Sequence, residues 1–368
     1  MSKCIAIGCG GAGNVLLNAL ATETKLFDNP KEQNFYYNTT SADLLASFVG
    51  KKLILDADGT GRDKKVGASI VKTNIQGILD NIDAFYTKNL KDSKGEIIQL
   101  MIITSLGGGT GSSVTPVILD FLEEIKTPKV KISVVAIMSS NKEGVATIPN
   151  CIKTFEELYN NYCLNGIIDN LIVFDNEKYE KDYGFNTYDY SAINSVIVSQ
   201  LYRIFSEEIN PKSNSGGMQA LDLNEKRRVM YWGKGVADYV RIDLDKSSIK
   251  EELSIESSIT VTNYKPSTAK AVSMKICIAE SRENTDEATI EYLNYAIEKV
   301  KRTYKNAFFV FGFEFNSANT EGFVSIELYI NGLEFLKKFE SNVKKATKEV
   351  SKLKEKNKEF KLVGDLDF

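Results

Sequence analysis

The sequence contains no histidine. This absence excludes Ser-His-Asp and Cys-His catalysis and any metal site built on histidine. The five cysteines are odd in number and none of them forms a CxxC pair, which argues against a disulfide framework and against a zinc site. Chemistry in this chain therefore depends on carboxylates, hydroxyls and amides, and we expect no metal ion held by protein ligands alone.

Long apolar runs and an excess of positive charge are also missing. No run is long enough to span a bilayer and no basic-then-apolar leader is present, so we expect a soluble, cytoplasmic protein without membrane contacts. The net charge of −3 argues against direct binding to nucleic acid. A chain of 368 residues predicts about two domains.

The most informative stretch runs from Ser105 to Ser113 and contains four glycines. An apolar run, 97–104, precedes it and is typical of a buried strand, whereas residues 114–125 carry apolar side chains at helical spacing. Glycines between a strand and a helix allow backbone N–H groups to turn inward at a helix N-terminus, which favours phosphate. No Gly-Lys-Ser or Gly-Lys-Thr follows, so this is not the lysine-bearing phosphate loop.

A second glycine-rich turn follows the apolar strand 3–8. Gly8, Gly10 and Gly13 match the GxGxxG dinucleotide fingerprint. That fingerprint also requires an acidic residue at the end of the second strand, and the predicted strand 34–37 ends in Asn38-Thr39-Thr40-Ser41 instead. A Rossmann-type NAD(P) oxidoreductase therefore remains as an alternative, with half of its usual site missing.

The first half of the chain alternates strands with helices, which predicts a parallel α/β sheet of Rossmann type. Further strands are expected at 53–55, 130–138 and 167–174, with a helix at 150–164. Each special loop follows a strand, and ligands of such sheets bind at the carboxyl ends of the strands. We therefore expect the loops to converge on one nucleotide site.

Residues 189–209 are predicted to form one long helix, in which Tyr190 and Asn194 share a face. That pair is suited to stack on and read a purine, but the residues alone favour a Tyr packed in the core beside a capping or buried Asn. Further on, Asp222 and Glu225 have the spacing of a helix capping box, or of two carboxylates that orient a water. The later half predicts an α+β domain, followed by a basic helical tail with a heptad stripe.

These motifs together resemble the tubulin/FtsZ superfamily of GTPases. Gly107–Ser112 is similar to the glycine-rich signature of that family, and Gly10–Asn14 to its first phosphate loop. The 38–40 stretch resembles the loop after the second strand, and Gly59-Thr60-Gly61 the loop that senses the γ-phosphate. The resemblance implies that GTP or GDP is bound, with Mg²⁺ held through the phosphates, by Gly10, Gly11, Gly13, Asn14, Asn38, Thr40, Gly59, Thr60, Gly61, Gly107, Gly108, Gly109, Thr110, Gly111, Ser112, Glu143, Asn176, Tyr190 and Asn194.

The resemblance also assigns catalytic roles. Asp222-Leu-Asn-Glu225 is similar to the loop that reaches into the nucleotide of the next subunit, with Glu as in α-tubulin where FtsZ has Asp. Two positions depart from the pattern, because Ala220 and Thr147 stand where an asparagine and an arginine are usual. The divergence and the basic tail are most similar to the plasmid and phage branch, the TubZ-like proteins.

The resemblance thus implies a homopolymer whose GTP hydrolysis is completed between stacked subunits. TubZ-like proteins move plasmid or phage DNA through a DNA-binding adaptor, which the tail would contact here. A phage-particle positioner, an FtsZ-like division filament and a non-hydrolysing relative are the alternatives. The expected division is a GTP-binding domain at 1–188, a central helix at 189–212, an activating domain at 213–332 and a C-terminal helix with tail at 333–368.

Overall fold

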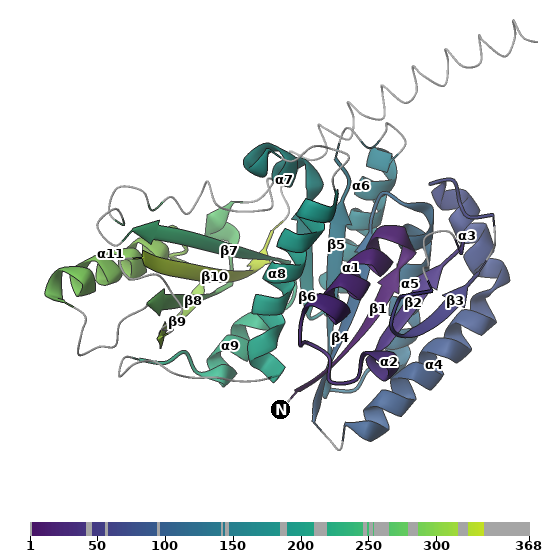
Figure 1. Cartoon of the computed structure of the whole chain (residues 1–368), viewed down its shortest axis with the longest axis horizontal. Coiled ribbons are helices and arrows are strands. Elements are labelled where there is room, and N and C mark those ends of the chain that lie inside the picture. The colour runs from purple at the N-terminus through teal and green to yellow at the C-terminus, as the bar shows by residue number, and fades with distance from the viewer. Residues whose placement is uncertain are drawn as a thin grey trace, which may run out of the picture.

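The computed structural model describes residues 2–41, 46–55, 58–93, 96–140, 143, 147–184, 190–209, 219–245, 249, 253, 265–278, 286–315 and 323–334. The expected boundary between the central helix and the activating domain, at residues 212 and 213, and the tail beyond residue 334 lie outside this part of the chain. A single sheet of ten strands runs through the molecule in the order β3-β2-β1-β4-β5-β6-β7-β10-β8-β9 (Figure 1).

The strands consist largely of apolar residues, and β1 to β6 lie at or near the six positions predicted for the first half of the chain. They are β1 Ser2–Cys9, β2 Asn34–Asn38, β3 Lys51–Ile54, β4 Ile97–Ser105, β5 Val130–Met138, β6 Asn170–Asp175, β7 Val236–Asp245, β8 Ala271–Ile278, β9 Phe308–Phe315 and β10 Phe323–Leu333. The pairing from β3 to β7 is parallel, β10 is antiparallel to both β7 and β8, and β8 pairs parallel with β9. The predicted α/β fold class with a second α+β part is confirmed.

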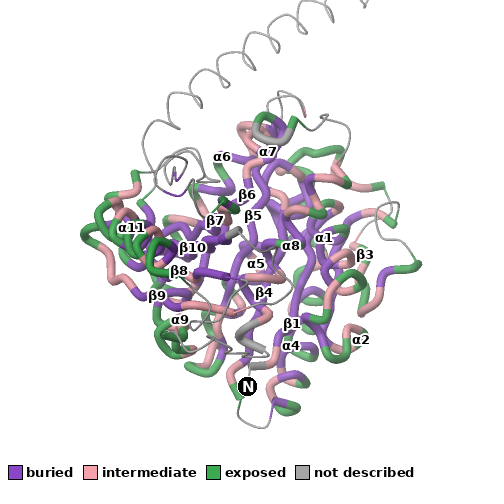
Figure 2. The backbone as a smooth tube through the Cα atoms, turned by 60° about the vertical axis from the view of Figure 1, so that its left-hand side comes forward, coloured by how far each residue is buried: buried purple, intermediate pink, exposed green. Residues whose placement is uncertain are grey.

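Helices cover both faces of the sheet. They are α1 Gly10–Glu23, α2 Pro30–Gln33, α3 Lys64–Thr73, α4 Ile75–Asp92, α5 Gly109–Ile125, α6 Thr147–Glu157, α7 Asn176–Tyr183, α8 Tyr190–Ile209, α9 Leu223–Met230 and α11 Glu287–Thr303, with a π-helical turn at Leu158–Cys163 and a 3-10 turn at Pro266–Thr268. Alternate strand residues face opposite sides, so that Ile5 and Ile7 belong to the core on the side of α4, α5 and α6, whereas Cys4 and Ala6 belong to the core on the side of α1 and α8. The strands form the buried centre in Figure 2.

The predicted strand 167–174 begins later than expected. The backbone N–H groups of Ile167 and Ile168 both donate to the Tyr162 carbonyl, at 2.9 and 3.1 Å, and so close the preceding helical turn. These two apolar residues are buried in the turn, and the sheet begins only at Asn170. Burial without strand pairing explains why the apolar pattern alone placed the strand too early.

The two halves of the chain share the sheet through a short contact. Strand β7 pairs with β6 at only two positions, Leu171 with Val236 and Ile172 with Ala237. This register puts the start of β7 at the amino end of β6. The segment between α9 and β7 therefore lies at the amino ends of the parallel strands, opposite to their carboxyl ends.

Candidate functional site

The loops singled out in the sequence meet around one cavity of about 560 Å³. It lies at the carboxyl ends of β1, β2, β4, β5 and β6, where ligands of parallel sheets bind. The predicted residues that line it are Gly10, Gly11, Asn38, Thr40, Gly59, Thr60, Gly61, Gly107, Gly108, Gly109, Thr110, Gly111, Glu143, Asn176, Tyr190 and Asn194. The cavity has the size of a small-molecule site.

Two helices begin at this cavity without a side-chain cap. Helix α1 starts after Cys9 and α5 after Gly108, and neither has an N-cap hydrogen bond or an acidic residue in its first turn. By contrast, an aspartate caps each of α3, α7, α9 and α11. The N–H groups of α1 and α5 therefore face the cavity together with the positive ends of two helix dipoles, which favours an anion such as phosphate.

Glycine allows the two phosphate-type turns to approach each other. Gly10 has a φ of +76°, and a Cβ added there would lie 3.0 Å from the backbone nitrogen of Gly111. A Cβ on Gly109 would lie 2.3 Å from the Thr60 hydroxyl oxygen. The loop that contains Thr60 is thus seated against the first turn of α5, and no larger residue fits between them.

Hydroxyl and amide groups at the end of β2 and in the first turn of α5 line the same side of the cavity. The Thr39 and Thr110 hydroxyls are hydrogen-bonded to each other at 2.7 Å. Asn38 is buried, its Oδ1 accepts from the Thr39 backbone N–H, and its Nδ2 has no hydrogen-bond partner among the described residues. A buried amide donor that lines the cavity is suited to a polar ligand, because it is costly to leave such a donor unpaired.

The opposite end of the cavity carries a different set of side chains. Glu143 Oε1 accepts from the Asn176 side-chain amide and from the Ser140 backbone N–H, both at 3.0 Å. Asp175 caps α7 and so fixes Asn176 at the first position of that helix. Tyr190 and Asn194 come from the first turns of α8 and line the same space. An aromatic ring and amides are therefore available for a base and a ribose.

Three residues that were predicted to bind the nucleotide do not line the cavity but pack behind the residues that do. A Cβ on Gly13 would lie 2.3 Å from the Ile103 carbonyl oxygen, so Gly13 lets α1 pack against β4. Asn14 is buried and its amide donates to the Tyr37 carbonyl at 2.9 Å. The buried Ser112 hydroxyl donates to the carbonyls of Gly108 and Gly109 within α5. Their contacts shape the loops around the cavity.

Other lining residues were not predicted as ligands. They are Cys9, Ala12, Val15, Leu16, Thr39, Asp58, Arg62, Ser105, Ile137, Ser139 and Thr147. Most of them are neighbours in the sequence of a residue that was predicted to bind the nucleotide. Their position beside a motif is the one feature of the sequence that could have predicted them. Burial raises the pKa of the Cys9 thiol to about 12, which keeps it neutral and unreactive.

The predicted catalytic residues do not line the cavity. Asp222 caps α9 through hydrogen bonds from the backbone N–H groups of Asn224 and Glu225, as a capping box requires. The other end of α9 is held by Asn331, whose amide donates to the carbonyls of Val229 and Met230. This helix lies near the N-terminus in Figure 1, whereas the residues that line the cavity follow the carboxyl ends of the strands, and both carboxylates are exposed.

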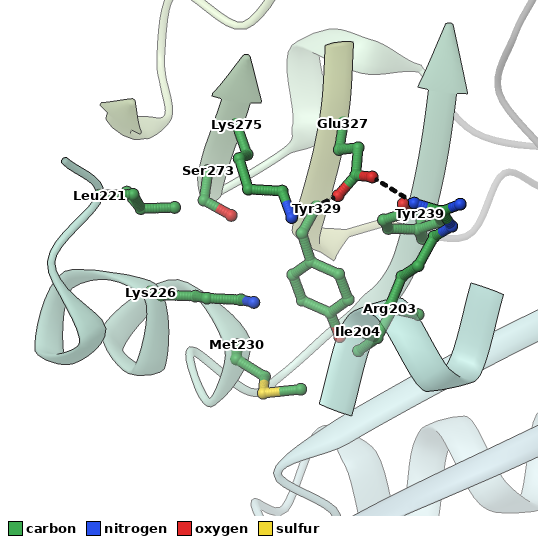
Figure 3. Close-up of a pocket in the computed structure, with 10 residues that line it drawn as sticks. All are labelled: Arg203, Ile204, Leu221, Lys226, Met230, Tyr239, Ser273, Lys275, Glu327 and Tyr329. Atoms are coloured by element: carbon green, nitrogen blue, oxygen red, sulfur yellow. Dashed lines mark hydrogen bonds and ion pairs between the residues drawn. The ribbon is translucent and has the colours of Figure 1, made fainter. Parts of the chain in front are cut away.

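A separate cluster joins α8 to the second half of the sheet. The carboxylate of Glu327, only 5% exposed, contacts Arg203 at 2.9 Å, Lys275 at 2.9 Å and Arg241 at 3.3 Å. Figure 3 shows Glu327 on β10 between the Arg203 and Lys275 side chains, with Tyr329 and Tyr239 beside it. Since Tyr190 and Asn194 begin the same α8, this cluster ties the wall of the cavity to the strands of the second half.

No helix in the described ranges combines the length and hydrophobicity that crossing a bilayer requires. Within the same ranges, no three Cys, Asp or Glu side chains gather into a metal site.

Comparison with known proteins identifies relatives of this chain. Residues 3–184 match the model of the Tubulin/FtsZ family, GTPase domain. The tubulin-like protein CetZ3 of Haloferax volcanii is 26% identical over 254 residues, which cover 66% of this chain and 61% of CetZ3. The tubulin-like protein CetZ of Methanothrix thermoacetophila is 23% identical over 333 residues, which cover 84% of this chain and 83% of that protein.

Solved structures agree on the fold. The GTPγS-bound protofilament of CetZ2 from Haloferax volcanii has a TM-score of 0.71 at 18% identity and covers 96% of this chain and 99% of CetZ2. TubZ of Bacillus thuringiensis serovar israelensis, in a GTPγS-form protofilament, has a TM-score of 0.75 at 18% identity over 97% of this chain and 94% of TubZ. In the sequence comparison, this chain spans less than two thirds of the length of two curated relatives from Haloferax volcanii, 61% of CetZ3 and 63% of CetZ4. Assignment to the TubZ branch stays a prediction.

Proposed function

We propose that this chain, a member of the Tubulin/FtsZ family through the GTPase domain at residues 3–184, binds GTP in the cavity and hydrolyses it within a head-to-tail filament of its own copies. The observation that carries this proposal is the distance between the nucleotide cavity and the two carboxylates predicted to be catalytic. The nucleotide cavity lies at the carboxyl ends of the strands, and α9 lies at the other end of the molecule.

GTP would be bound by polar groups that the fold holds in fixed positions around the cavity. The N–H groups at the starts of α1 and α5 hold the phosphates, and Asn38 donates its buried amide to the same ligand. Tyr190 and Asn194 hold the base. Mg²⁺ bound through the phosphates supplies charge neutralisation during phosphoryl transfer. The chain's own part is to fix the phosphates against two helix N-termini, so that little reorganisation is needed when charge develops.

Hydrolysis requires a second copy. Asp222 and Glu225 cannot reach the nucleotide of their own chain, but a copy stacked on the cavity would present α9 to it and orient the attacking water. A contact between two different ends of one molecule is heterologous, and when it does not close into a ring it generates a filament. The solved structures of CetZ2 and TubZ are of protofilaments, which supports this arrangement.

The proposal is tested by GTP turnover at increasing protein concentration. Activity per subunit is expected to rise with concentration and to level off once filaments have formed, as followed by light scattering. Glu225→Gln removes the charge but keeps the size, so it should bind GTP and assemble while turnover falls roughly 100-fold. Glu298→Gln, at an exposed position of α11, is the matched control and should behave as wild type. Full turnover by dilute, unassembled protein would contradict the proposal.

For the cargo of the filament, we keep plasmid or phage DNA, carried through a DNA-binding adaptor, as the proposal. A cell-division filament is the rival, because Cell division protein FtsZ 1 of Methanocaldococcus jannaschii is 23% identical over 61% of this chain. The test compares capture of partners by the full chain and by a chain ending at residue 334. Loss of a DNA-binding partner on truncation supports segregation, whereas retention of the same partners by both chains counts against the adaptor.

A further inference from the structure

Gly312 is the one glycine in β9, the aromatic strand at the edge of the sheet. Phe308, Val310 and Gly312 alternate along β9 and therefore face the same side of it. Helix α9 packs on that side, since the guanidinium carbon of Arg228 lies 4.3 Å from the centre of the Phe308 ring. A glycine inside a strand weakens it and often marks a place where another backbone approaches closely.

The backbone that approaches Gly312 is the segment 219–222, which leads into α9. A Cβ added to Gly312 would lie 2.5 Å from the Cα of Leu221. Phe313, the next residue on β9, donates its backbone N–H to the Gln219 carbonyl at 2.7 Å. The segment thus rests on the outer edge of β9 at a point where only a glycine leaves room for it.

This contact directly precedes the two carboxylates predicted to be catalytic. The Asp222 side chain accepts from the backbone N–H groups of Asn224 and Glu225, which fixes it relative to α9. The other end of α9 is held by the amide of Asn331. Leu221 lines a pocket together with residues of α9, β8 and β10 (Figure 3). Helix α9 is therefore held at both ends, and the contact with β9 is the anchor that adjoins the carboxylates.

We propose that Gly312 is a positioning residue for GTP hydrolysis, because it lets the segment 219–222 rest against β9 and so fixes where Asp222 and Glu225 meet the nucleotide of the next copy. This inference rests on the proposed function, since it concerns the carboxylates assigned there. A Cβ at Gly312 would displace the segment by roughly 1 Å, because it would press on backbone atoms that cannot turn aside. A misplacement of about 1 Å can lower a rate by about 100-fold even when the changed residue does not touch the reacting atoms.

The test compares GTP turnover and GTPγS affinity for wild type, Gly312→Ala and a control. Turnover is measured per sedimented subunit at saturating GTP, so that a change in assembly is not counted as a change in rate. Gly312→Ala should lose roughly 10- to 100-fold in turnover. Its GTPγS affinity should stay within about threefold of wild type, because the residues that line the cavity lie between positions 9 and 194 and not on β9.

Gly50→Ala is the matched control, because it adds the same methyl group at the opposite edge of the sheet, next to β3. Its Cβ would lie 2.7 Å from the Asn34 carbonyl oxygen, so it also overpacks a backbone contact. It should lower the melting temperature while turnover per sedimented subunit stays as in wild type.

Mixing experiments show on which side of the contact between copies the defect lies. Gly10→Val adds a side chain that presses on the Gly111 backbone at the cavity wall, but its α9 is intact. A mixture of Gly312→Ala with Gly10→Val should therefore hydrolyse GTP well above the sum of the two. A mixture of Gly312→Ala with Glu225→Gln should show no such gain, because α9 is defective in both. A general loss of stability would give the same result with both partners.

Leu221→Ala tests the same contact without overpacking, in case Gly312→Ala does not fold. It removes the side chain that anchors the segment, so turnover should fall about 10-fold at unchanged GTPγS affinity. Wild-type turnover in the folded variants, or an equal loss in Gly50→Ala, would overturn the inference while the proposed function stands. If wild-type turnover did not rise with assembly, the proposed function itself would be wrong.

Discussion

Replacing Gly13 by alanine is a sharp test of how the cavity is built. An added Cβ would lie 2.3 Å from the Ile103 carbonyl oxygen and 3.0 Å from the carbon of the same carbonyl. Both atoms belong to the backbone of β4 in the middle of the sheet, so they cannot move aside as a side-chain tip would. Helix α1 must therefore shift by roughly 1 Å to restore an ordinary contact.

The cost follows from overpacking a rigid contact. We expect Gly13→Ala to destabilise the protein by about 1–3 kcal/mol, which lowers Tm by roughly 2–8 °C. The shift also moves the start of α1, where Gly10 and Gly11 line the cavity, so GTP affinity should fall as well. Circular dichroism melting and a GTP titration measure the two effects.

Gly77→Ala is the matched control, because Gly77 lies on the exposed side of α4 with nothing within 4 Å of an added Cβ. Alanine there should stabilise the protein by about 0.5–1 kcal/mol through helix propensity. If Gly13→Ala melted and bound GTP as wild type does, the close packing of α1 on β4 would be refuted.

Three further predictions concern other parts of the molecule. Thr110→Val removes the hydroxyl bonded to buried Thr39 and should cost about 1–3 kcal/mol in a denaturant titration; an unchanged midpoint would contradict the pairing. The five cysteines are buried, so a thiol reagent should modify none of them in native protein and all five after unfolding, and rapid native labelling would be inconsistent with the fold. Trp232, the one tryptophan in the sequence, is 40% exposed beside α9, so its emission should change when GTP drives assembly; constant emission during filament growth would place it outside the contact.

Local patterns were sufficient to predict much of the fold. A strand followed by glycines and an uncapped helix is readable from the residues themselves, and the parallel topology then brings such turns to one edge of the sheet. For that reason Gly10, Gly109 and Asn176 could be expected around one cavity. The continuity of the sheet could not be predicted, because it depends on only two paired positions between β6 and β7.

The roles of individual motif residues depend on packing that a motif does not encode. Gly13, Asn14 and Ser112 belong to the glycine-rich stretches, yet their contacts are with Ile103, Tyr37 and the carbonyls of α5. The third glycine of GxGxxG is known to serve helix–strand packing, and that signal could have placed Gly13 correctly. Arg62 was not predicted to line the cavity, since neither its positive φ nor its hydrogen bond to the Glu143 carbonyl is visible in the sequence.

The central claim is that one copy holds GTP and the next copy completes its hydrolysis. It is tested most directly by mixing two inactive variants: Glu225→Gln, which retains its cavity, and Gly10→Val, whose side chain would press on the Gly111 backbone at the cavity wall but whose α9 is intact. The account predicts that the mixture hydrolyses GTP well above the sum of the separate variants, because the intact α9 of one acts on the nucleotide of the other. A mixture no more active than that sum, although the two variants co-sediment, would contradict it.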